Sequence, residues 1–193
     1  MPPSVKITRE MILDAAFDLV RREGHEHLSA RRVSEALRCS TQPVMYNYKT
    51  AEALRQAVYA RTDAFHTRYI LPGEGTGDPL LELGMNYIRF AHEEGNLFRF
   101  LFQSGQLGGR NLESLTEDPE AAPILALAGE ALGGGPEAAK EAFLGLFAAV
   151  HGLASLLANT AMDYEEQRFR RLLMGLFEGM TAGEGETEHA EDL

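Results

Sequence analysis

The amino-acid sequence predicts an all-α protein of about nine helices. Its 193 residues show no sustained period-two alternation of apolar and polar side chains and no Asn-Gly or Asp-Gly hairpin turn, which are the main signals of paired strands. Helix start and stop signals recur instead, among them Thr8, Gly24 and the pair Asp78-Pro79. Because 45% of the residues are apolar, the chain can form a packed core.

Four helices are predicted in the first 70 residues, each after a residue whose side chain can cap it. The first begins after Thr8 and ends at Gly24, with apolar side chains recurring on one face. Two short helices follow Ser29 and Ser40, and a longer one follows Thr50. The short turns between the first three indicate a small three-helix core.

Clusters of glycine and proline divide the rest of the chain into further helices. Breaks are expected at 72–77 and 133–136, and a loop at 105–117, which is rich in Gly, Asn, Ser and Thr. The expected helices are one from Asp78-Pro79 to about Gly95, one capped by Asn96, one after Asp118-Pro119, one over 137–160, and a last one started by Asp163 and Glu166 as a capping box.

Charge is distributed unevenly along the chain. The net charge is −11, yet residues 1–62 hold ten Lys/Arg against seven Asp/Glu, a net of +3, while 63–193 hold eight against 22, a net of −14. Such asymmetry indicates a small polyanion-binding part on an acidic body, with chance as the alternative. Residues 182–193 carry five acids and no base, which predicts an acidic disordered tail.

Residues 29–48 have the pattern of a helix-turn-helix, in which the second short helix enters the major groove of DNA. Val33, Leu37 and Val44 would face inward, with the turn at Arg38-Cys39. The outward side chains are hydroxyls, an amide, arginines and tyrosines, which are groups that contact phosphates and base edges.

The chain resembles the TetR family of bacterial transcriptional regulators. Residues 8–59 are similar to its DNA-binding domain in the segments Ile12–Ala16, Arg22–Gly24, Leu28–Val33, the helix start at Ser40, and Tyr48 followed by Glu52–Leu54. Later segments resemble the ligand-sensing domain of a branch that often carries a Trp-His-Gly motif, namely Tyr87–Ala91, Asn96–Phe102 and Val150–Leu156. The resemblance implies a DNA-binding domain at 1–50 and a ligand-binding and dimerisation domain at 51–181.

Four positions depart from the family pattern. Met45 stands where the recognition helix usually has tyrosine, Ala51 where a lysine is usual, and Val150 where the motif has tryptophan. Loss of the tyrosine and the lysine leaves fewer phosphate anchors. Arg38 replaces the usual turn glycine, so we expect a non-glycine residue in an unfavourable turn conformation.

The resemblance implies a set of DNA-contacting residues, with roles that follow from their chemistry. Gln42 can bond adenine, and Thr41 can bond a base or touch a thymine methyl group. Tyr48 has a core position as its alternative, and Arg31 a solvated surface. The set comprises Ser29, Arg31, Ser40, Thr41, Gln42, Pro43, Tyr46, Tyr48 and Lys49, with Ser29, Ser40 and Lys49 as phosphate anchors.

Two further sites are expected in the second domain by the same resemblance. A homodimer interface would use small residues of the 137–160 helix and the apolar stripe of the last helix, unless these pack within one chain: Gly145, Ala149, Gly152, Ser155, Phe169, Leu172, Leu173, Leu176 and Phe177. An apolar pocket for an unknown small-molecule effector, with an ordinary core as the alternative, would use Phe90, Phe98, Phe102, Phe143, Phe147 and His151.

The sequence provides little support for an enzyme, a metal-binding protein or a membrane protein. No catalytic or nucleotide-binding motif is present, no two histidines have helical metal-site spacing, and Cys39 is the one cysteine. No apolar run comes near bilayer length, so we expect a cytoplasmic protein without membrane, metal or cofactor. We expect a repressor that binds palindromic double-stranded operator DNA and is released by its effector. A regulator without an effector, or an adaptor that has lost DNA binding, remains the alternative.

Overall fold

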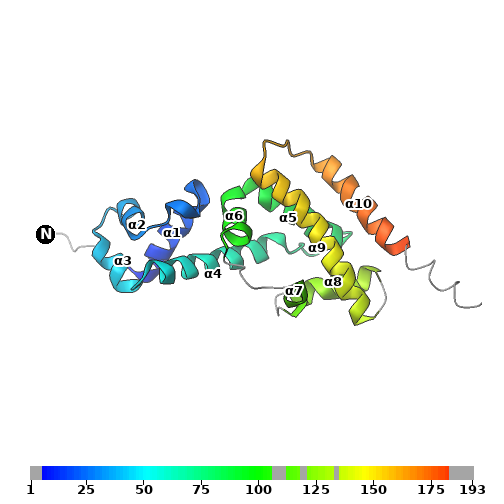
Figure 1. Cartoon of the computed structure of the whole chain (residues 1–193), viewed down its shortest axis with the longest axis horizontal. Coiled ribbons are helices and arrows are strands. Elements are labelled where there is room, and N and C mark those ends of the chain that lie inside the picture. Colours follow the sequence, from blue (N-terminus) through cyan, green and yellow to red (C-terminus); the bar gives the residue numbers. More distant parts are fainter. Residues whose placement is uncertain (1–5, 106–111, 118–120, 133–134, 183–193) are drawn as a thin grey trace, which may run out of the picture. The chain divides into compact units, whose positions relative to one another are not determined.

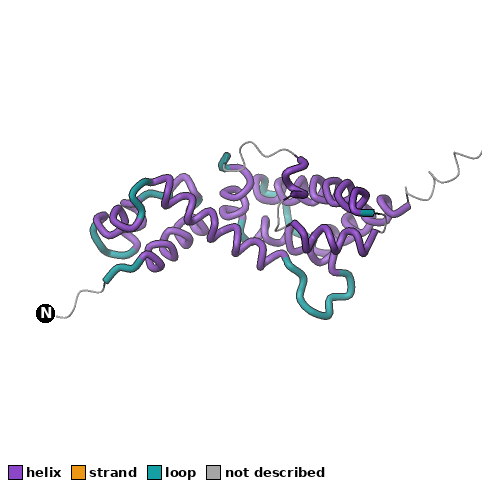
Figure 2. The backbone as a smooth tube through the Cα atoms, turned by 90° about the horizontal axis from the view of Figure 1, so that it is seen from below, coloured by secondary structure: helices purple, strands orange, loops and turns teal. Residues whose placement is uncertain are grey.

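The computed structural model describes residues 6–105, 112–117, 121–132 and 135–182, and every regular element in these ranges is a helix (Figures 1 and 2). The predicted all-α class is therefore confirmed. The α-helices are α1 (Arg9–Glu23), α2 (Ala30–Ala36), α3 (Thr41–Asn47), α4 (Ala51–Ile70), α5 (Pro79–Glu93), α6 (Gly95–Gln103), α7 (Leu112–Glu117), α8 (Ala122–Leu132), α9 (Pro136–Asn159) and α10 (Glu166–Ala182), and one 3-10 helix covers His25–His27.

The chain forms two compact units. Its described residues up to 68, together with 94–105, make the N-terminal unit, and 69–93 with the described residues from 112 onward make the C-terminal unit. Most of α4 and all of α6 thus pack with the first three helices. The predicted division at residue 50 separates a DNA-binding from a ligand-binding domain. That boundary does not coincide with the boundaries of these compact units, and the division by function stays a prediction. Of the acidic tail expected at 182–193, Ala182 is the last residue of α10, and the rest lies outside the described residues.

The N-terminal unit begins its helices at the predicted caps. The Thr8 hydroxyl accepts the Met11 N–H at 3.2 Å, and the Ser29 hydroxyl accepts the Arg32 N–H at 3.2 Å. Gly24 ends α1 with a φ of 98°, a left-handed value that favours glycine. The apolar side chains between these caps form the core of the unit: Ile12, Ala16, Leu19, Val20, Val33, Val44, Leu54 and Val58.

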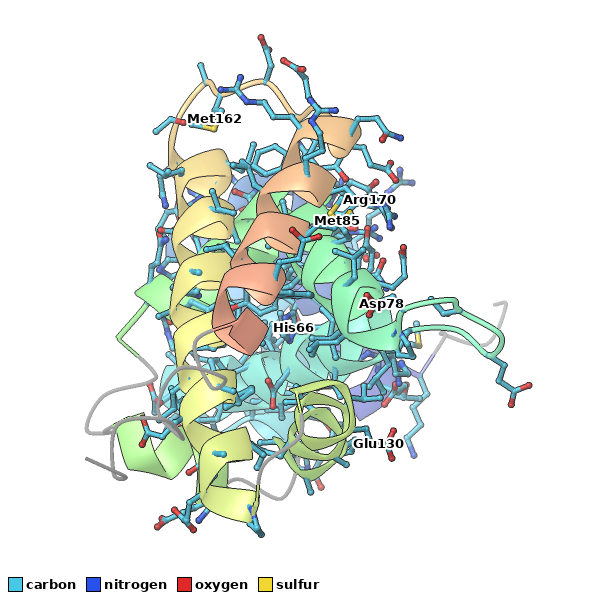
Figure 3. The ribbon with its side chains drawn as sticks, turned by 90° about the vertical axis from the view of Figure 1, so that its right-hand side faces the viewer. His66, Asp78, Met85, Glu130, Met162 and Arg170 are labelled. Carbon is cyan, nitrogen blue, oxygen red and sulfur yellow. The ribbon has the colours of Figure 1, made fainter. Side chains whose placement is uncertain are left out.

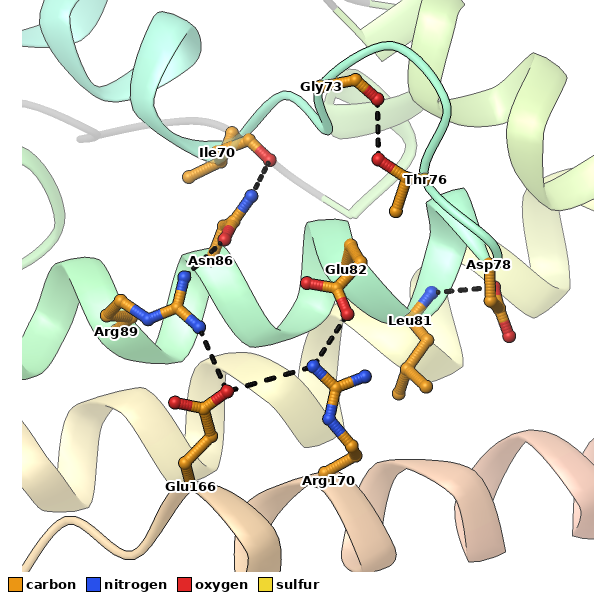
Figure 4. Close-up of polar contacts among 10 residues, drawn as sticks. All are labelled: Ile70, Gly73, Thr76, Asp78, Leu81, Glu82, Asn86, Arg89, Glu166 and Arg170. Carbon is orange, nitrogen blue, oxygen red and sulfur yellow. Dashed lines mark hydrogen bonds and ion pairs between the residues drawn. The ribbon is translucent and has the colours of Figure 1, made fainter.

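In the C-terminal unit α5 lies against α9 and α10, and α8 lies against α9. Asp78 caps α5 as predicted by accepting the Leu81 N–H at 3.0 Å. Gly84 permits close approach of α10, because an added Cβ would come within 3.0 Å of Leu173 Cδ1. Arg170 of α10, labelled in Figure 3, also pairs with Glu82 of α5 at 2.6 Å (Figure 4).

Three local expectations were wrong. Residues 112–117 form α7 inside the stretch expected to be a loop, where α7 packs on α9. Asn96 does not cap α6; Glu94 holds that position, and the Asn96 amide bonds Arg21 O. The last helix starts at Glu166, because the Glu165 carbonyl accepts the Arg168 and Phe169 N–H groups, so Asp163 lies before the helix rather than in a capping box.

The expectation that no apolar run approaches bilayer length is wrong for helix α9. Among the described helices it alone is long and apolar enough to cross a membrane, by length and composition only. About 28% of that stretch is buried within the chain. One face packs on α5 and α8, while Gly145, Ala148 and Gly152 lie on an exposed face. The core helix of a globular domain meets the same length and composition.

Candidate nucleic-acid interface

Helices α2 and α3 form the predicted helix-turn-helix. Val33 of α2 and Val44 of α3 are buried, and the two helices pack against each other and against α1. The Ser34 hydroxyl is buried as well and donates to the Arg31 carbonyl at 2.8 Å. A small apolar core on one side of α3 therefore leaves its other side free to face a partner.

The turn between the two helices contains the strained backbone expected from the sequence. Arg38 has a φ of 52°, in the left-handed region where a side chain costs about 1–2 kcal/mol. The following N–H, that of Cys39, donates to the Ser34 carbonyl at 3.0 Å and closes the turn. The arginine side chain is exposed. The turn thus keeps its geometry with a cation in the place of glycine.

The exposed face of α3 presents side chains that can read DNA. Thr41 and Gln42 are exposed in the first turn, and Tyr46 is 84% exposed. Met45 adds an apolar, half-exposed side chain beside them. The Ser40 hydroxyl, at the N-cap position, makes no capping bond to the helix. Hydroxyl, amide and phenol groups thus lie together on this face.

Tyr48 lies in the core rather than on this face. It is 3% exposed, and the Arg9 guanidinium stands 4.9 Å from the centre of its ring. Its hydroxyl is buried and has no hydrogen-bond partner among the described residues. The structure therefore corrects the assignment of Tyr48 as a DNA contact, because surrounding side chains cover it.

The other residues predicted to contact DNA differ in whether their side chains are free to bind a partner. Arg31 Nε donates to Glu35 at 2.9 Å, and this hydrogen bond raises the pKa of the guanidinium. Ser29 is used as the cap of α2 and is half-buried, and Pro43 is half-buried in α3. Lys49 is exposed just before α4. The predicted residues that are exposed and open to a partner are thus Ser40, Thr41, Gln42, Tyr46 and Lys49.

Three of the six predicted pocket residues come together in the C-terminal unit. The Phe143 and Phe147 rings stack at 5.9 Å, and Phe147 stacks on His151 at 5.4 Å. Tyr87 of α5, which was not predicted from the sequence, joins them through its hydroxyl, 2.9 Å from His151 Nδ1. Burial raises the pKa of Tyr87 and lowers that of His151. This cluster combines apolar faces with one polar pair.

The other three predicted pocket residues lie elsewhere. Phe98 and Phe102 pack together in the N-terminal unit, at 4.9 Å, and Phe102 contacts the His66 ring at 5.3 Å. Burial lowers the pKa of His66 to about 4. Phe90 contacts Tyr69 at 5.3 Å in the C-terminal unit. All three have ordinary packing partners, as the core interpretation expected.

A shallow groove of about 450 Å³ runs between α9 and α10. Some of the predicted interface residues line this groove, some are in the core, and others lie outside both. Phe169 and Leu173 are buried within the unit, so they are unavailable to a partner, and Phe177 is half-buried. Gly145 and Gly152 are exposed. The groove is lined by Ala149, Leu153, Arg171, Leu172, Gly175 and Leu176, of which Ala149, Leu172 and Leu176 were predicted from the sequence.

These features define a helix-turn-helix protein with a separate helical body. Residues 80–180, just over half of the chain, match the family model described as tetracyclin repressor-like, C-terminal domain. The chain therefore belongs to the TetR family and is a DNA-binding transcriptional regulator rather than an enzyme. The resemblance seen in the sequence is confirmed.

Two solved structures share the fold. The multidrug binding protein EbrR, in a complex with imidazole, is 21% identical, with a TM-score of 0.59, and the match covers 87% of this chain and 88% of that one. A variant of TetR from Acinetobacter baumannii AYE, in a complex with minocycline, is 19% identical, with a TM-score of 0.60 and coverage of 92% and 98%. No curated protein matches the chain in sequence.

Proposed function

We propose that this protein is a cytoplasmic, homodimeric repressor that binds a palindromic operator and is released by a small, largely apolar effector. The observation that carries the proposal is the exposed face of α3, where Thr41, Gln42 and Tyr46 project from a helix anchored by Val44. Such a helix can enter the major groove and present its polar groups to base edges.

The contacts divide into two kinds. Gln42 and Thr41 are placed to read bases, because an amide can bond adenine at two atoms and a threonine methyl group fits thymine. Ser40 and Lys49 are placed to bond phosphates, which sets the register of the helix on the duplex. Arg31 joins them once its guanidinium exchanges Glu35 for a phosphate.

The groove between α9 and α10 supports the dimer. No Asp, Glu, Lys or Arg occurs from residue 142 to 162, so the exposed side of α9 is uncharged from residue 142 onward and includes Gly145, Ala148, Gly152 and Leu156. Gly152 and Gly175 have open space where a Cβ would stand, which allows a partner helix to approach closely. Two recognition helices in one molecule would then read two half-sites about one helical turn apart or a multiple of it.

The effector would bind near the cluster of Phe143, Phe147, His151 and Tyr87. Aromatic faces with one polar pair suit a mainly apolar molecule that carries a hydrogen-bonding group. The two structures that share the fold hold imidazole and minocycline, both small organic molecules. Binding would shift the population toward a state whose recognition helices no longer fit the operator.

The experiment is selection of DNA from a random pool, followed by fluorescence anisotropy with the enriched sequence at several salt concentrations. We expect sub-micromolar binding to one palindrome, with log affinity falling steeply as log salt rises. Failure to enrich any sequence, with only weak binding to all DNA, would contradict the proposal and favour an adaptor that has lost DNA binding.

A further inference from the structure

We propose that Met45 is a specificity-determining residue of α3 that recognises the methyl group of a thymine in each half-site of the operator. This inference deepens the proposed DNA-binding function and rests on it. The Met45 side chain is 47% exposed although it is apolar. The exposed side chains nearest to it along the helix, those of Thr41, Gln42 and Tyr46, are polar, so Met45 is the apolar member of this surface.

Met45 lies on the side of α3 that holds the residues expected to read bases (Figure 1). Successive residues of an α-helix are rotated by about 100°, which places Met45 between Thr41 and Gln42 around the helix axis, one turn further along. On the other flank, the Asn47 amide donates to the Pro43 carbonyl at 2.8 Å and so is engaged within its own helix. Met45 would therefore enter the major groove together with Thr41 and Gln42.

The chemistry of the Met45 side chain restricts what it can recognise on DNA. A thioether has no hydrogen-bond donor, so it cannot bond the phosphate oxygens, which accept. In the major groove the edges of guanine, cytosine and adenine present hydrogen-bond donors and acceptors, and thymine alone adds a methyl group. The unbranched, flexible side chain of methionine adapts well to such an apolar surface. Thymine is thus the base that Met45 can distinguish.

The position of Met45 relative to Gln42 predicts where that thymine lies. The two residues are three positions apart and are therefore neighbours on the helix surface. The Gln42 amide is placed to bond an adenine at two atoms. We expect each half-site to contain a thymine in the base pair of that adenine or in the pair next to it.

Uracil tests the inference because it pairs as thymine does and lacks only the methyl group. Each thymine of the selected operator is replaced by uracil in turn, in both half-sites, and the affinity of the full chain is measured by anisotropy. In the parent, one such replacement should weaken binding about fourfold for each half-site, as expected for one methyl group that is no longer buried. Met45→Gln should bind the thymine and uracil operators equally at this position. Met45→Leu, which stays apolar, should keep the difference.

Two further variants identify the side chain that is responsible. Thr41→Ser keeps the hydroxyl and removes the methyl group of Thr41, so a uracil effect that persists in Thr41→Ser and is lost in Met45→Gln belongs to Met45. Met162→Gln is the matched control and should keep the parent response, because Met162 is 44% exposed but lies in the C-terminal unit (Figure 3).

The outcomes separate this inference from the proposed function. If the parent binds a selected operator but no thymine shows a methyl effect that depends on Met45, or the half-sites contain no thymine, the inference is overturned and the proposed function stands. If no sequence is enriched, the proposed function is overturned, and this inference with it.

Discussion

The two units differ in the side chains that they leave exposed. The N-terminal unit exposes hydroxyl, amide, phenol and cationic groups around α3, and the C-terminal unit exposes apolar side chains on α9 and α10, such as Leu156, Leu172 and Leu176, beside charged ones such as Arg171. A polar, charged surface suits a partner held by salt-dependent contacts to phosphates and base edges. An apolar surface suits one that stays bound and excludes water. On the proposed function, the exchangeable contacts to DNA and the lasting contacts of a dimer would therefore lie on separate units.

Breaking the apolar surface should have the largest effect. Leu172→Arg replaces an apolar side chain of the groove between α9 and α10 with a second arginine beside Arg171, which would prevent a partner helix from packing there. We expect a monomer by sedimentation velocity and about a 100-fold loss of operator affinity. The loss follows because binding at one half-site would no longer keep a second recognition helix close to the other half-site. Met174→Arg is the control: Met174 is 44% exposed against 46% for Leu172, but it lies outside the groove lining. An unchanged dimer in Leu172→Arg would place the interface elsewhere.

Acid should weaken the N-terminal unit through His66. Burial lowers the pKa of His66 to about 4 from its usual 6.5, so the folded state binds fewer protons than the unfolded state between these values. Its contribution to stability is complete above pH 6.5 and is lost as the pH falls toward 4. We expect urea unfolding to show a loss of about 2 kcal/mol from this residue between pH 7.5 and pH 5.

His66→Gln should flatten that part of the pH dependence. The control is His27→Gln, which changes an exposed histidine of the same unit and should leave the pH dependence as it is. If the free energy of unfolding falls equally with pH in the parent and in His66→Gln, then His66 is not the cause of the acid destabilisation.

On the polar surface, loss of one base-reading group should have a moderate effect. Gln42→Ala removes the amide on the exposed face of α3, so we expect about a tenfold loss of operator affinity with little change for unrelated DNA. Anisotropy on both sequences measures the ratio. Gln56→Ala is the matched control, since Gln56 is exposed on α4 and bonds Glu52 at 3.2 Å. An equal loss on both sequences would make Gln42 a phosphate contact instead.

The smallest expected effect concerns the ion pair between Arg31 and Glu35. Glu35→Gln frees the guanidinium for a phosphate, so operator affinity should rise about twofold and its salt dependence should steepen. Glu10→Gln weakens a comparable exposed pair, with Arg61 of α4 at 2.7 Å, and leaves Arg31 bonded to Glu35. A rise of the same size in both variants would indicate a general charge effect rather than release of Arg31.

The sequence predicted what depends on neighbours along the chain. Thr8, Ser29 and Asp78 cap helices as expected because a cap involves residues only three positions apart. The left-handed turn at Arg38 followed from its position in the motif. The short helix α7 was missed because six residues have little helix stability of their own, and packing on α9 supports it.

What depends on distant residues was harder to predict. Tyr87 meets His151 across 64 positions, and no spacing in the sequence indicates that pair. Phe98 and Phe102 were grouped with Phe143 by residue type, but they follow Glu94 and so pack in the other unit. Phe169 and Leu173 share a stripe with Leu172, and only the packing on α5 separates buried from exposed members.

The turn at Arg38 also bears on how fast the protein finds DNA. An exposed cation beside α3 raises the local positive potential, and such charges speed encounter with a polyanion at low salt more than they tighten the final complex. Glycine there would relieve the backbone and remove that charge. Arg38 thus lowers the folding stability and raises the rate of association with DNA. The gain in rate would shrink as added salt screens the charge, since the screening length falls to about 8 Å at physiological ionic strength.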